Sequence, residues 1–315
     1  MRVVVLCIVC LFFVASCNQV NQLEPIEPEP VPAKVIAEVK HWYPDAENLV
    51  FKPLLEKLVW EVKFDQGVDK YLTLADSTKI WETYRYTSEV APPKLLELLN
   101  KSALKGGTFS ANREAIGFIM PNHRNRLIYN LYGTDYLFDW LYVDNRVAGA
   151  AFDMGLYSFL LNDLKVLPQS VQTYINADPN IKFEGTEVKV MLNYEKFYEV
   201  MVSFDKAGVK TYAYLLFNET GDLRWFSRAF NEPEDLYGPP NFDKLPDAIQ
   251  QYLDASPELA SFSTQYIASM QWMGEYRGSK CYTIRYINNT TFDSCDLQFD
   301  AEGNLVNKSY FIFFQ

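Results

Sequence analysis

Phe217-Asn218-Glu219-Thr220-Gly221-Asp222-Leu223 is a heptapeptide that returns near the end of the chain as Phe299-Asp300-Ala301-Glu302-Gly303-Asn304-Leu305. The two copies match at the Phe, at the Asn or Asp, at the Gly and at the Leu. An Asn or Asp side chain opens a turn by bonding to the nearby backbone, and Gly supplies the positive φ that closes it. Each copy therefore predicts a tight turn between two antiparallel strands. A shorter version stands at Val143–Val147, and a version of the same length that lacks the Gly stands at Leu74–Ile80.

A helical pattern precedes each of the four turns. It begins at Val31-Pro32, Ala91-Pro92, Leu167-Pro168 and Leu245-Pro246, and proline suits the first turn of a helix because no N–H is needed there. In each segment, the residue before the proline and the residues four, seven and eight positions later lie on one face of a helix. Fifteen of these sixteen positions are apolar, and the exception is Glu38. We expect a short amphipathic helix at the start of each segment.

The hydrophobic period changes to two after each helix. In the third segment every second residue from Tyr198 to Phe204 is apolar, and in the first segment the same holds from Trp60 to Phe64. Such alternation indicates half-buried strands. The expected fold class is therefore α+β, with four tandem repeats of one helix plus a roughly four-stranded antiparallel sheet. Repeats 1 and 2 should form one lobe over residues 31–160, and repeats 3 and 4 a second lobe over residues 161–315.

Three short motifs together resemble a known family. The helix end at Tyr43-Pro44-Asp45-Ala46, the strand Trp60-Glu61-Val62-Lys63-Phe64 and the final Phe-Asp-x-x-Gly-x-Leu turn resemble PepSY-like domains, which are grouped with the β-lactamase-inhibitor-protein fold. The resemblance covers residues 31–315 and is weakest in the second segment. It implies a periplasmic or surface lipoprotein with an inhibitory or peptide-binding role, and it offers no catalytic residues to carry over.

The N-terminus has the pattern of a bacterial lipoprotein signal. Met1-Arg2 supplies a positive start, and the uncharged apolar run Val3–Val14 follows. That run is shorter than the roughly 20 residues that span a bilayer, so it fits a signal peptide over residues 1–16. Val14-Ala15-Ser16-Cys17 resembles a lipobox, in which the cysteine thiol accepts the lipid. An ordinary signal peptide is the alternative. If the lipobox is genuine, residues 17–30 comprise the lipidated Cys17 and a partly stiff Glu/Pro spacer.

Composition and motifs narrow the class of function. The chain has 315 residues and a formal net charge of −11, which argues against a nucleic-acid partner. Neither of its two histidines, His41 and His123, has a Cys or His at metal-ligand spacing. The sequence also has no nucleophile elbow, phosphate-binding loop or dinucleotide fingerprint. We therefore expect no enzymatic activity, no cofactor and no metal.

Two kinds of function stay open. The first is a non-catalytic envelope lipoprotein that acts as a binding scaffold for a peptide, protein or glycan ligand. The second is a structural or envelope-maintenance lipoprotein without a small ligand, or a protein inhibitor by analogy with the β-lactamase-inhibitor fold. In both, the lipid on Cys17 makes the membrane a partner. The expected location is the outer membrane, at its periplasmic or surface face.

Cys281 and Cys295 are the two cysteines of the folded part, and export exposes them to oxidising conditions. A hairpin centred on Asn288 would place them opposite each other, so a disulfide is one expectation. Alternation argues against it, because a core face that holds Tyr282 and Cys295 would turn Cys281 away. The pairing stays open at the level of the sequence.

The strands that lead into the second and third turns are aromatic on a second face. When the segments are aligned on their turns, Ala213, Leu215 and Phe217 face the core of the third segment. The aromatic residues left on the opposite faces are Tyr136, Phe138, Trp140 and Tyr142 in the second segment and Tyr212 and Tyr214 in the third. An apolar outer face is unusual unless something covers it. These residues therefore form a possible ligand surface or an inter-repeat surface.

The lipid anchor is testable with a single substitution. We expect Cys17→Ser to lose labelling by radioactive palmitate and to leave the membrane fraction, because the thiol is the acyl acceptor. Asn18→Ser is the matched control and should keep both properties. Full labelling or unchanged fractionation of Cys17→Ser would contradict the assignment.

Overall fold

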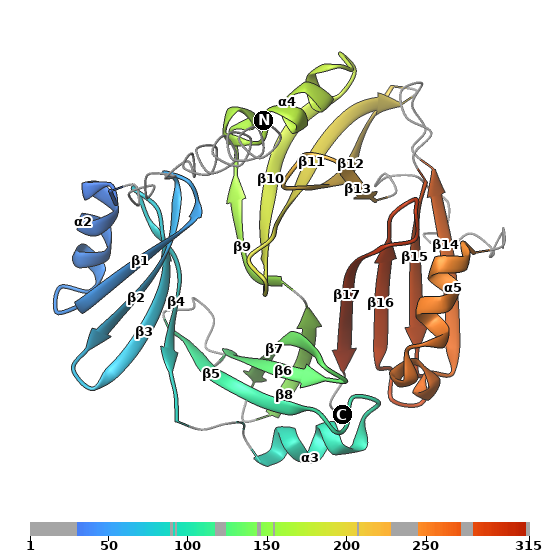
Figure 1. Cartoon of the computed structure of the whole chain (residues 1–315), viewed down its shortest axis with the longest axis horizontal. Helices are drawn as coiled ribbons and strands as arrows, with labels where there is room; N and C mark the ends of the chain where they lie inside the picture. Colours follow the sequence, from blue (N-terminus) through green and yellow to red (C-terminus); the bar gives the residue numbers. More distant parts are fainter. Residues whose placement is uncertain are drawn as a thin grey trace, which may run out of the picture.

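The structure is a computed structural model, and it describes residues 30–88, 91, 93–116, 124–143, 146–153, 155–206, 208–227, 245–271 and 280–312. Four α-helices, two short 3-10 helices and seventeen strands follow one another in these residues (Figure 1). The first segment holds α2 (Ala33–Trp42), β1 (Glu47–Leu55), β2 (Val59–Gln66), β3 (Asp69–Ala75) and β4 (Ile80–Tyr86). The second holds α3 (Pro93–Lys101), β5 (Thr108–Ile116), β6 (Arg124–Leu131), β7 (Thr134–Val143) and β8 (Arg146–Asp153).

The second half of the chain starts with one additional strand. Its elements are β9 (Gly155–Leu161), η1 (Leu164–Val166), α4 (Gln169–Asn176), β10 (Lys182–Met191), β11 (Lys196–Lys206), β12 (Val209–Asn218) and β13 (Leu223–Phe226). The last elements are α5 (Asp247–Asp254), η2 (Pro257–Ser261), β14 (Thr264–Gln271), β15 (Lys280–Ile287), β16 (Ser294–Phe299) and β17 (Leu305–Ile312).

Strand pairing joins these strands into two antiparallel sheets. The larger has twelve strands in the order β1-β2-β3-β4-β5-β6-β7-β8-β17-β16-β15-β14, and the smaller has five in the order β13-β12-β11-β10-β9. Figure 1 shows the two sheets curving around a common centre, with the helices on the outside and the five-stranded sheet at the top. The first, second and fourth segments thus belong to one continuous sheet.

The expected fold class, α+β with four tandem repeats of one helix plus a sheet, is wrong. The chain is mostly β, and its strands do not divide into four separate sheets. The periodicity of a sequence reveals helices and strands, but it does not reveal which strand edges pair. Here β4 pairs with β5 and β8 pairs with β17, so the sheet runs through the expected repeat boundaries.

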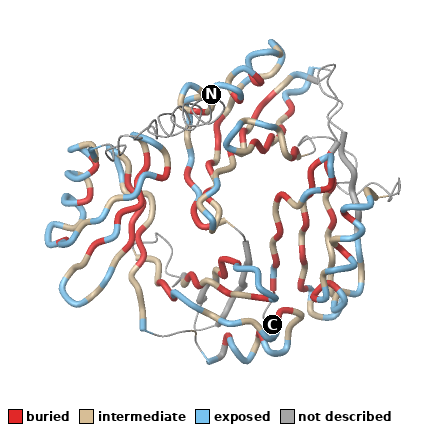
Figure 2. Tube along the Cα trace, viewed as in Figure 1, coloured by how far each residue is buried: buried red, intermediate tan, exposed pale blue. Residues whose placement is uncertain are grey.

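The helical pattern itself is confirmed, and it determines where the cores lie. Val35 and Val39 of α2 pack on β2 in one cluster, and Val171 and Ile175 of α4 pack on the five-stranded sheet in another. α3 and α5 share a third cluster. Figure 2 shows buried and more exposed residues alternating along many strands, as expected where one face of a sheet is covered.

Strand pairs also cross residue 160, the expected boundary between the lobes at 31–160 and 161–315. β9 pairs with β10 across it, and β17 returns to pair with β8. The division into two lobes stays a prediction.

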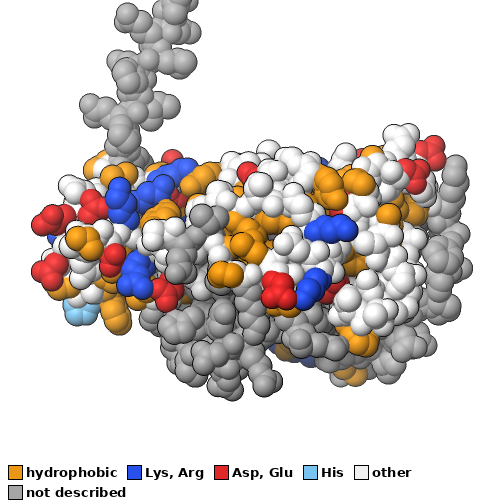
Figure 3. Space-filling model, turned by 90° about the horizontal axis from the view of Figure 1, so that it is seen from below, with side chains coloured by type: hydrophobic (Ala, Val, Ile, Leu, Met, Phe, Trp, Pro, Cys, Tyr) orange, Lys and Arg blue, Asp and Glu red, His pale blue; other side chains and the backbone are white. Residues whose placement is uncertain are grey.

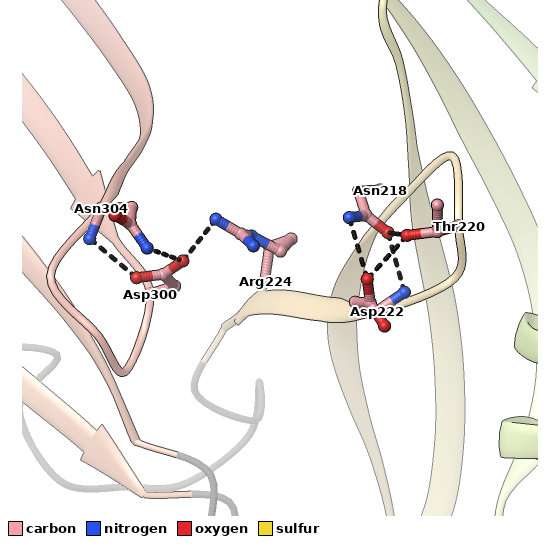
Figure 4. Close-up of polar contacts among 6 residues, drawn as sticks. All are labelled: Asn218, Thr220, Asp222, Arg224, Asp300 and Asn304. Carbon is pink, nitrogen blue, oxygen red and sulfur yellow. Dashed lines mark hydrogen bonds and ion pairs between the residues drawn. The ribbon is translucent and has the colours of Figure 1, made fainter. Parts of the chain in front are cut away.

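The Asx–Gly turns form as predicted, and each contacts the start of a helix. The Asn218 and Asp300 side chains accept hydrogen bonds from the backbone N–H groups of Asp222 (2.8 Å) and Asn304 (2.7 Å) (Figure 4). Gly221 has φ +83° and Gly303 has φ +87°, in the left-handed region that favours glycine.

Close packing adds a second reason for glycine at both turns. A Cβ on Gly221 would lie 1.8 Å from Ser170 Oγ, at the start of α4. A Cβ on Gly303 would lie 3.1 Å from atoms of Ala248 and Ile249, at the start of α5. The conformation and the packing therefore both select Gly in the heptapeptide.

The two reasons for glycine can be separated by mutation. Gly208 has φ +80° with nothing within 4 Å of an added Cβ, so Gly208→Ala measures the cost of the backbone alone, about 1–2 kcal/mol. We expect Gly221→Ala to lower the free energy of unfolding by more than this, because Ser170 must also move. Urea unfolding followed by circular dichroism measures both. Equal losses in the two variants would mean that the contact with α4 adds nothing.

Candidate functional site

The structure separates the two groups of aromatic residues that the sequence placed on an outer face. Tyr136 and Phe138 are buried, and they belong to the cluster that contains Leu95 and Leu99 of α3. They therefore face the helix and not the opposite side of the sheet. The same cluster contains residues of the fourth segment, and the Tyr136 ring meets that of Tyr310, so these two side chains pack between segments, as the inter-repeat alternative expects. Trp140 and Tyr142 belong to β7, but the structure does not describe their side chains.

The turn between β7 and β8 explains the error. Only two residues separate the paired Val143 and Arg146, whereas five residues separate the paired Phe217 and Leu223. The second segment cannot be aligned with the third on turns of different length. A shift of one residue moves every side chain of a strand to the other face.

The disulfide between Cys281 and Cys295 is also wrong, because both thiols are free. The hairpin closes where Ile287 pairs with Ser294, so Cys295 lies opposite Tyr286 and not opposite Cys281. The two cysteines also face different cores, as alternation indicated. Burial raises the pKa of both thiols, that of Cys281 to about 12.

Tyr212 and Tyr214 lie on β12, on the face of the five-stranded sheet that points away from α4. Ala213, Leu215 and Phe217 are buried on the α4 side, as the sequence predicted, while Tyr212 and Tyr214 are half-buried. Ser203 pairs with Tyr212 and Met201 with Tyr214, which extends the face across β11. We call this surface the Tyr212 face; its members are Glu184, Glu187, Lys189, Glu199, Met201, Lys210, Tyr212 and Tyr214.

One end of the same sheet face is already covered. Leu216 and Trp225 are paired neighbours there, and both are buried. The Trp225 indole N–H donates to Thr283 of β15 at 3.2 Å, and the Cys281 thiol donates to the carbonyl of Phe226. The twelve-stranded sheet therefore packs over this end and leaves Met201, Tyr212 and Tyr214 at the more open end.

The charges of the Tyr212 face are paired within the face. Lys189 lies 2.9 Å from Glu199 and 3.9 Å from Glu187, and Lys210 lies 2.7 Å from Glu184. Hydrogen bonds from Lys210 and Ser203 hold the pKa of Glu184 below its usual range. Exposed pairs of this kind contribute little stability, but they leave no strong field of one sign around the tyrosines.

A second group of polar residues is buried where the two sheets meet. Tyr157 of β9 and Tyr194, in the turn after β10, both donate hydrogen bonds to the Glu61 carboxylate of β2, at 2.7 and 3.1 Å. Arg113 of β5 donates to the Tyr157 hydroxyl at 3.4 Å. Glu61 is 1% exposed and Arg113 is 4% exposed. We call these four residues the Glu61 cluster.

The Glu61 cluster connects the sheets. Its Glu61, Arg113 and Tyr157 side chains are buried, while Tyr194 is half-buried at the edge, where the half-exposed Lys63 lies 3.4 Å from the Glu61 carboxylate. Burial, together with the nearby Glu61 carboxylate, raises the pKa of Tyr194 to about 12, and burial also raises the pKa of Tyr157. Both phenols therefore stay protonated at neutral pH and can donate to Glu61. No pattern in the sequence indicated this cluster, because Glu61 occupies the polar position of an alternating strand.

Within the described ranges, no three His, Cys, Asp or Glu side chains are arranged to hold a metal ion. His123 lies outside those ranges. None of the helices in the described part is both long and apolar enough to cross a membrane. Figure 3 shows acidic and basic side chains interspersed over the end formed by α2 and β1–β4, at the left of that view.

Comparison with known proteins identifies no relative of this chain. No protein-family model matches the chain, and no curated protein is similar to it. The resemblance to PepSY-like domains stays a prediction.

We expect the hydrogen bonds of the Glu61 cluster to stabilise the folded protein. We expect Tyr157→Phe to lower the free energy of unfolding by about 1–3 kcal/mol, because the buried Glu61 loses a donor and Arg113 loses an acceptor. Tyr132, which is 64% exposed, provides the matched control. Tyr132→Phe should leave urea unfolding unchanged. A Tyr157→Phe chain as stable as the control would show that the cluster does not hold the sheets together.

Proposed function

We propose that this chain is a non-catalytic, lipid-anchored protein of the cell envelope that binds a peptide, protein or glycan ligand on the Tyr212 face. The observation that supports it is the pair of half-buried tyrosines on a regular sheet, next to Met201 and among charges that are already paired. An apolar surface of this kind is usually covered by something. In the described residues, the twelve-stranded sheet covers only the Trp225 end.

Tyrosine suits such a surface for physical reasons. Its ring supplies a large apolar contact with few rotatable bonds, and its hydroxyl keeps a hydrogen bond to water or to a ligand. Tyr is accordingly enriched among residues that dominate binding energy. Because alternate residues of a strand project from the same face of a sheet, the Tyr212 and Tyr214 rings lie side by side on one face of β12.

The N-terminal sequence supports the location. A lipid on Cys17 and a Glu/Pro spacer over residues 17–30 would place the folded part close to a membrane surface without embedding it. Nothing in the acidic composition favours a nucleic acid. The proposed location is the outer membrane, at its periplasmic or surface face.

The proposal is tested by capture of ligands with and without the two rings. The full chain is immobilised and presented with envelope extract and with a glycan array, in parallel with Tyr212→Ala/Tyr214→Ala. We expect the double variant to capture at least tenfold less ligand than the unmodified chain. Tyr132→Ala removes an exposed tyrosine from the turn between β6 and β7, outside the Tyr212 face, and should retain binding. Ligands captured equally by all three proteins would place binding elsewhere, and capture of none would remove the proposed function.

A further inference from the structure

The helix α2 directly follows the segment that is expected to carry the lipid. Thirteen residues, 18–30, lie between Cys17 and Val31, and α2 begins at Ala33. A chain of this length reaches at most about 45 Å when it is extended, and a helix of ten residues is about 15 Å long. Every part of α2 is therefore within reach of the bilayer that would hold a lipid on Cys17.

The face of α2 that points away from the sheet is cationic. Val35 and Val39 are buried against β2, and the exposed residues of the helix are Ala33, Lys34, Ile36, Ala37, Lys40, His41 and Trp42. Glu38 is the only carboxylate of α2; it is half-buried and accepts a hydrogen bond from the Trp42 indole N–H at 2.9 Å. Lys34 and Lys40 lie one turn before and one turn after the small Ala37, so they share the outer face with it.

The other α-helices of the described residues have different surfaces. Lys101 of α3 pairs with Glu97 of the same helix at 2.6 Å. The sequence of α4 contains no charged residue, and the charged residues of α5 are the acidic Asp247 and Asp254. In a chain of net charge −11, the helix whose exposed residues include lysines and no carboxylate is thus the one that follows the lipid.

The geometry points to a second membrane contact, in which the exposed face of α2 lies on the anionic headgroups of the bilayer that holds the lipid. The contact rests on the lipid anchor of the proposed function and adds the surface that meets the membrane. A lysine close to an anionic leaflet is attracted to it. The anchor makes the encounter intramolecular, so two lysines suffice where a free chain would need more. Ile36, 38% exposed, is the one large aliphatic side chain exposed on α2, which keeps the contact at the level of the headgroups.

Carboxylates near α2 in the sequence limit the contact to the helix itself. Asp45 and Glu47 are exposed beyond its end, and the spacer before it contains Glu24, Glu27 and Glu29. An anionic leaflet repels all five, so we expect the contact to be centred on the outer face of α2. The spacer is the competing occupant of that face, because its glutamates can pair with the same lysines.

The test uses the full lipidated chain in vesicles of phosphatidylcholine, with or without phosphatidylglycerol. Ala37→Cys carries an NBD fluorophore on α2, and Tyr132→Cys carries it in the turn between β6 and β7 as the control. Cys281 and Cys295 are buried and should resist labelling. Lipids with a spin-labelled headgroup quench a fluorophore that lies on the bilayer surface. In the anionic vesicles we expect at least threefold stronger quenching at position 37 than at position 132. The difference should vanish in neutral vesicles and at roughly 1 M salt, which shortens the Debye length to about 3 Å.

Charge reversal tests whether the two lysines make the contact. Lys34→Glu/Lys40→Glu should reduce the quenching at position 37 at least threefold. Lys105→Glu/Lys165→Glu makes the same change of charge at two exposed lysines outside α2 and should leave the quenching unchanged. Urea unfolding checks that both variants are folded. If the first is not, Lys34→Gln/Lys40→Gln removes the two charges with a residue of similar helix propensity.

Flotation of the chain with the vesicles distinguishes this contact from the anchor. If the chain floats but position 37 is quenched no more than position 132, the contact fails and the anchor stands; a spacer that covers the face gives this result. Equal quenching in neutral and anionic vesicles, or quenching that survives the charge reversal, also overturns the contact. If the chain does not float, the anchor and the contact both fail, while ligand capture by Tyr212 and Tyr214 is measured independently.

Discussion

The antiparallel pairing of β17 with β8 is the constraint on which the rest of the architecture depends. It matches Ser309 with Asp153 and Ile312 with Ala150, residues more than 150 positions apart along the chain. Through this ladder the last four strands become the continuation of the sheet that begins at β1. Side chains then reinforce the join, because the rings of Tyr136 and Tyr310 meet edge to face with centroids 5.5 Å apart. The buried Lys308 of β17 forms an ion pair with Glu258 of η2, which ties β17 to the α5 side.

With the large sheet made continuous in this way, the five-stranded sheet is held at both ends. At one end the Glu61 cluster attaches β9 and the turn after β10 to β2 and β5. At the other, Arg224 of β13 reaches the buried Asp300 carboxylate at 2.5 Å, in the turn before β17 (Figure 4). A buried ion pair stabilises a structure only where further hydrogen bonds satisfy it, and Asp300 also accepts hydrogen bonds from Asn304. The Tyr212 face is left at the more open end of a sheet that is fixed on both sides.

Local features were predictable from the sequence because local chemistry determines them. The turns at Gly221 and Gly303, the helix faces at Val35 and Val171, and the orientation of Tyr212 and Tyr214 all follow from spacing and from φ. The pairing of β8 with β17 was not predictable, because periodicity is the same whichever edge a strand pairs with. Neither was the burial of Glu61: a carboxylate between two apolar residues of a strand resembles an ordinary solvent-facing position until another sheet packs on it. Tyr136 and Phe138 of β7 were misplaced because a shorter turn shifted their register by one residue.

The pairing of β8 with β17 is tested most directly by a disulfide across the seam. Cα atoms of directly opposed residues in antiparallel strands are roughly 4.5–5.5 Å apart, within the range that a disulfide spans. The full chain with Asp153→Cys and Ser309→Cys is oxidised under mild conditions, and its peptides are mapped by mass spectrometry. The native Cys281 and Cys295 thiols are buried and should not interfere. The account predicts a cross-link between positions 153 and 309 in the folded protein. It predicts a much weaker one when Phe152→Cys replaces Asp153→Cys, because successive positions of a strand alternate between the two faces of a sheet. Absence of the cross-link between 153 and 309 in a folded protein would contradict the continuous sheet and the arrangement built on it.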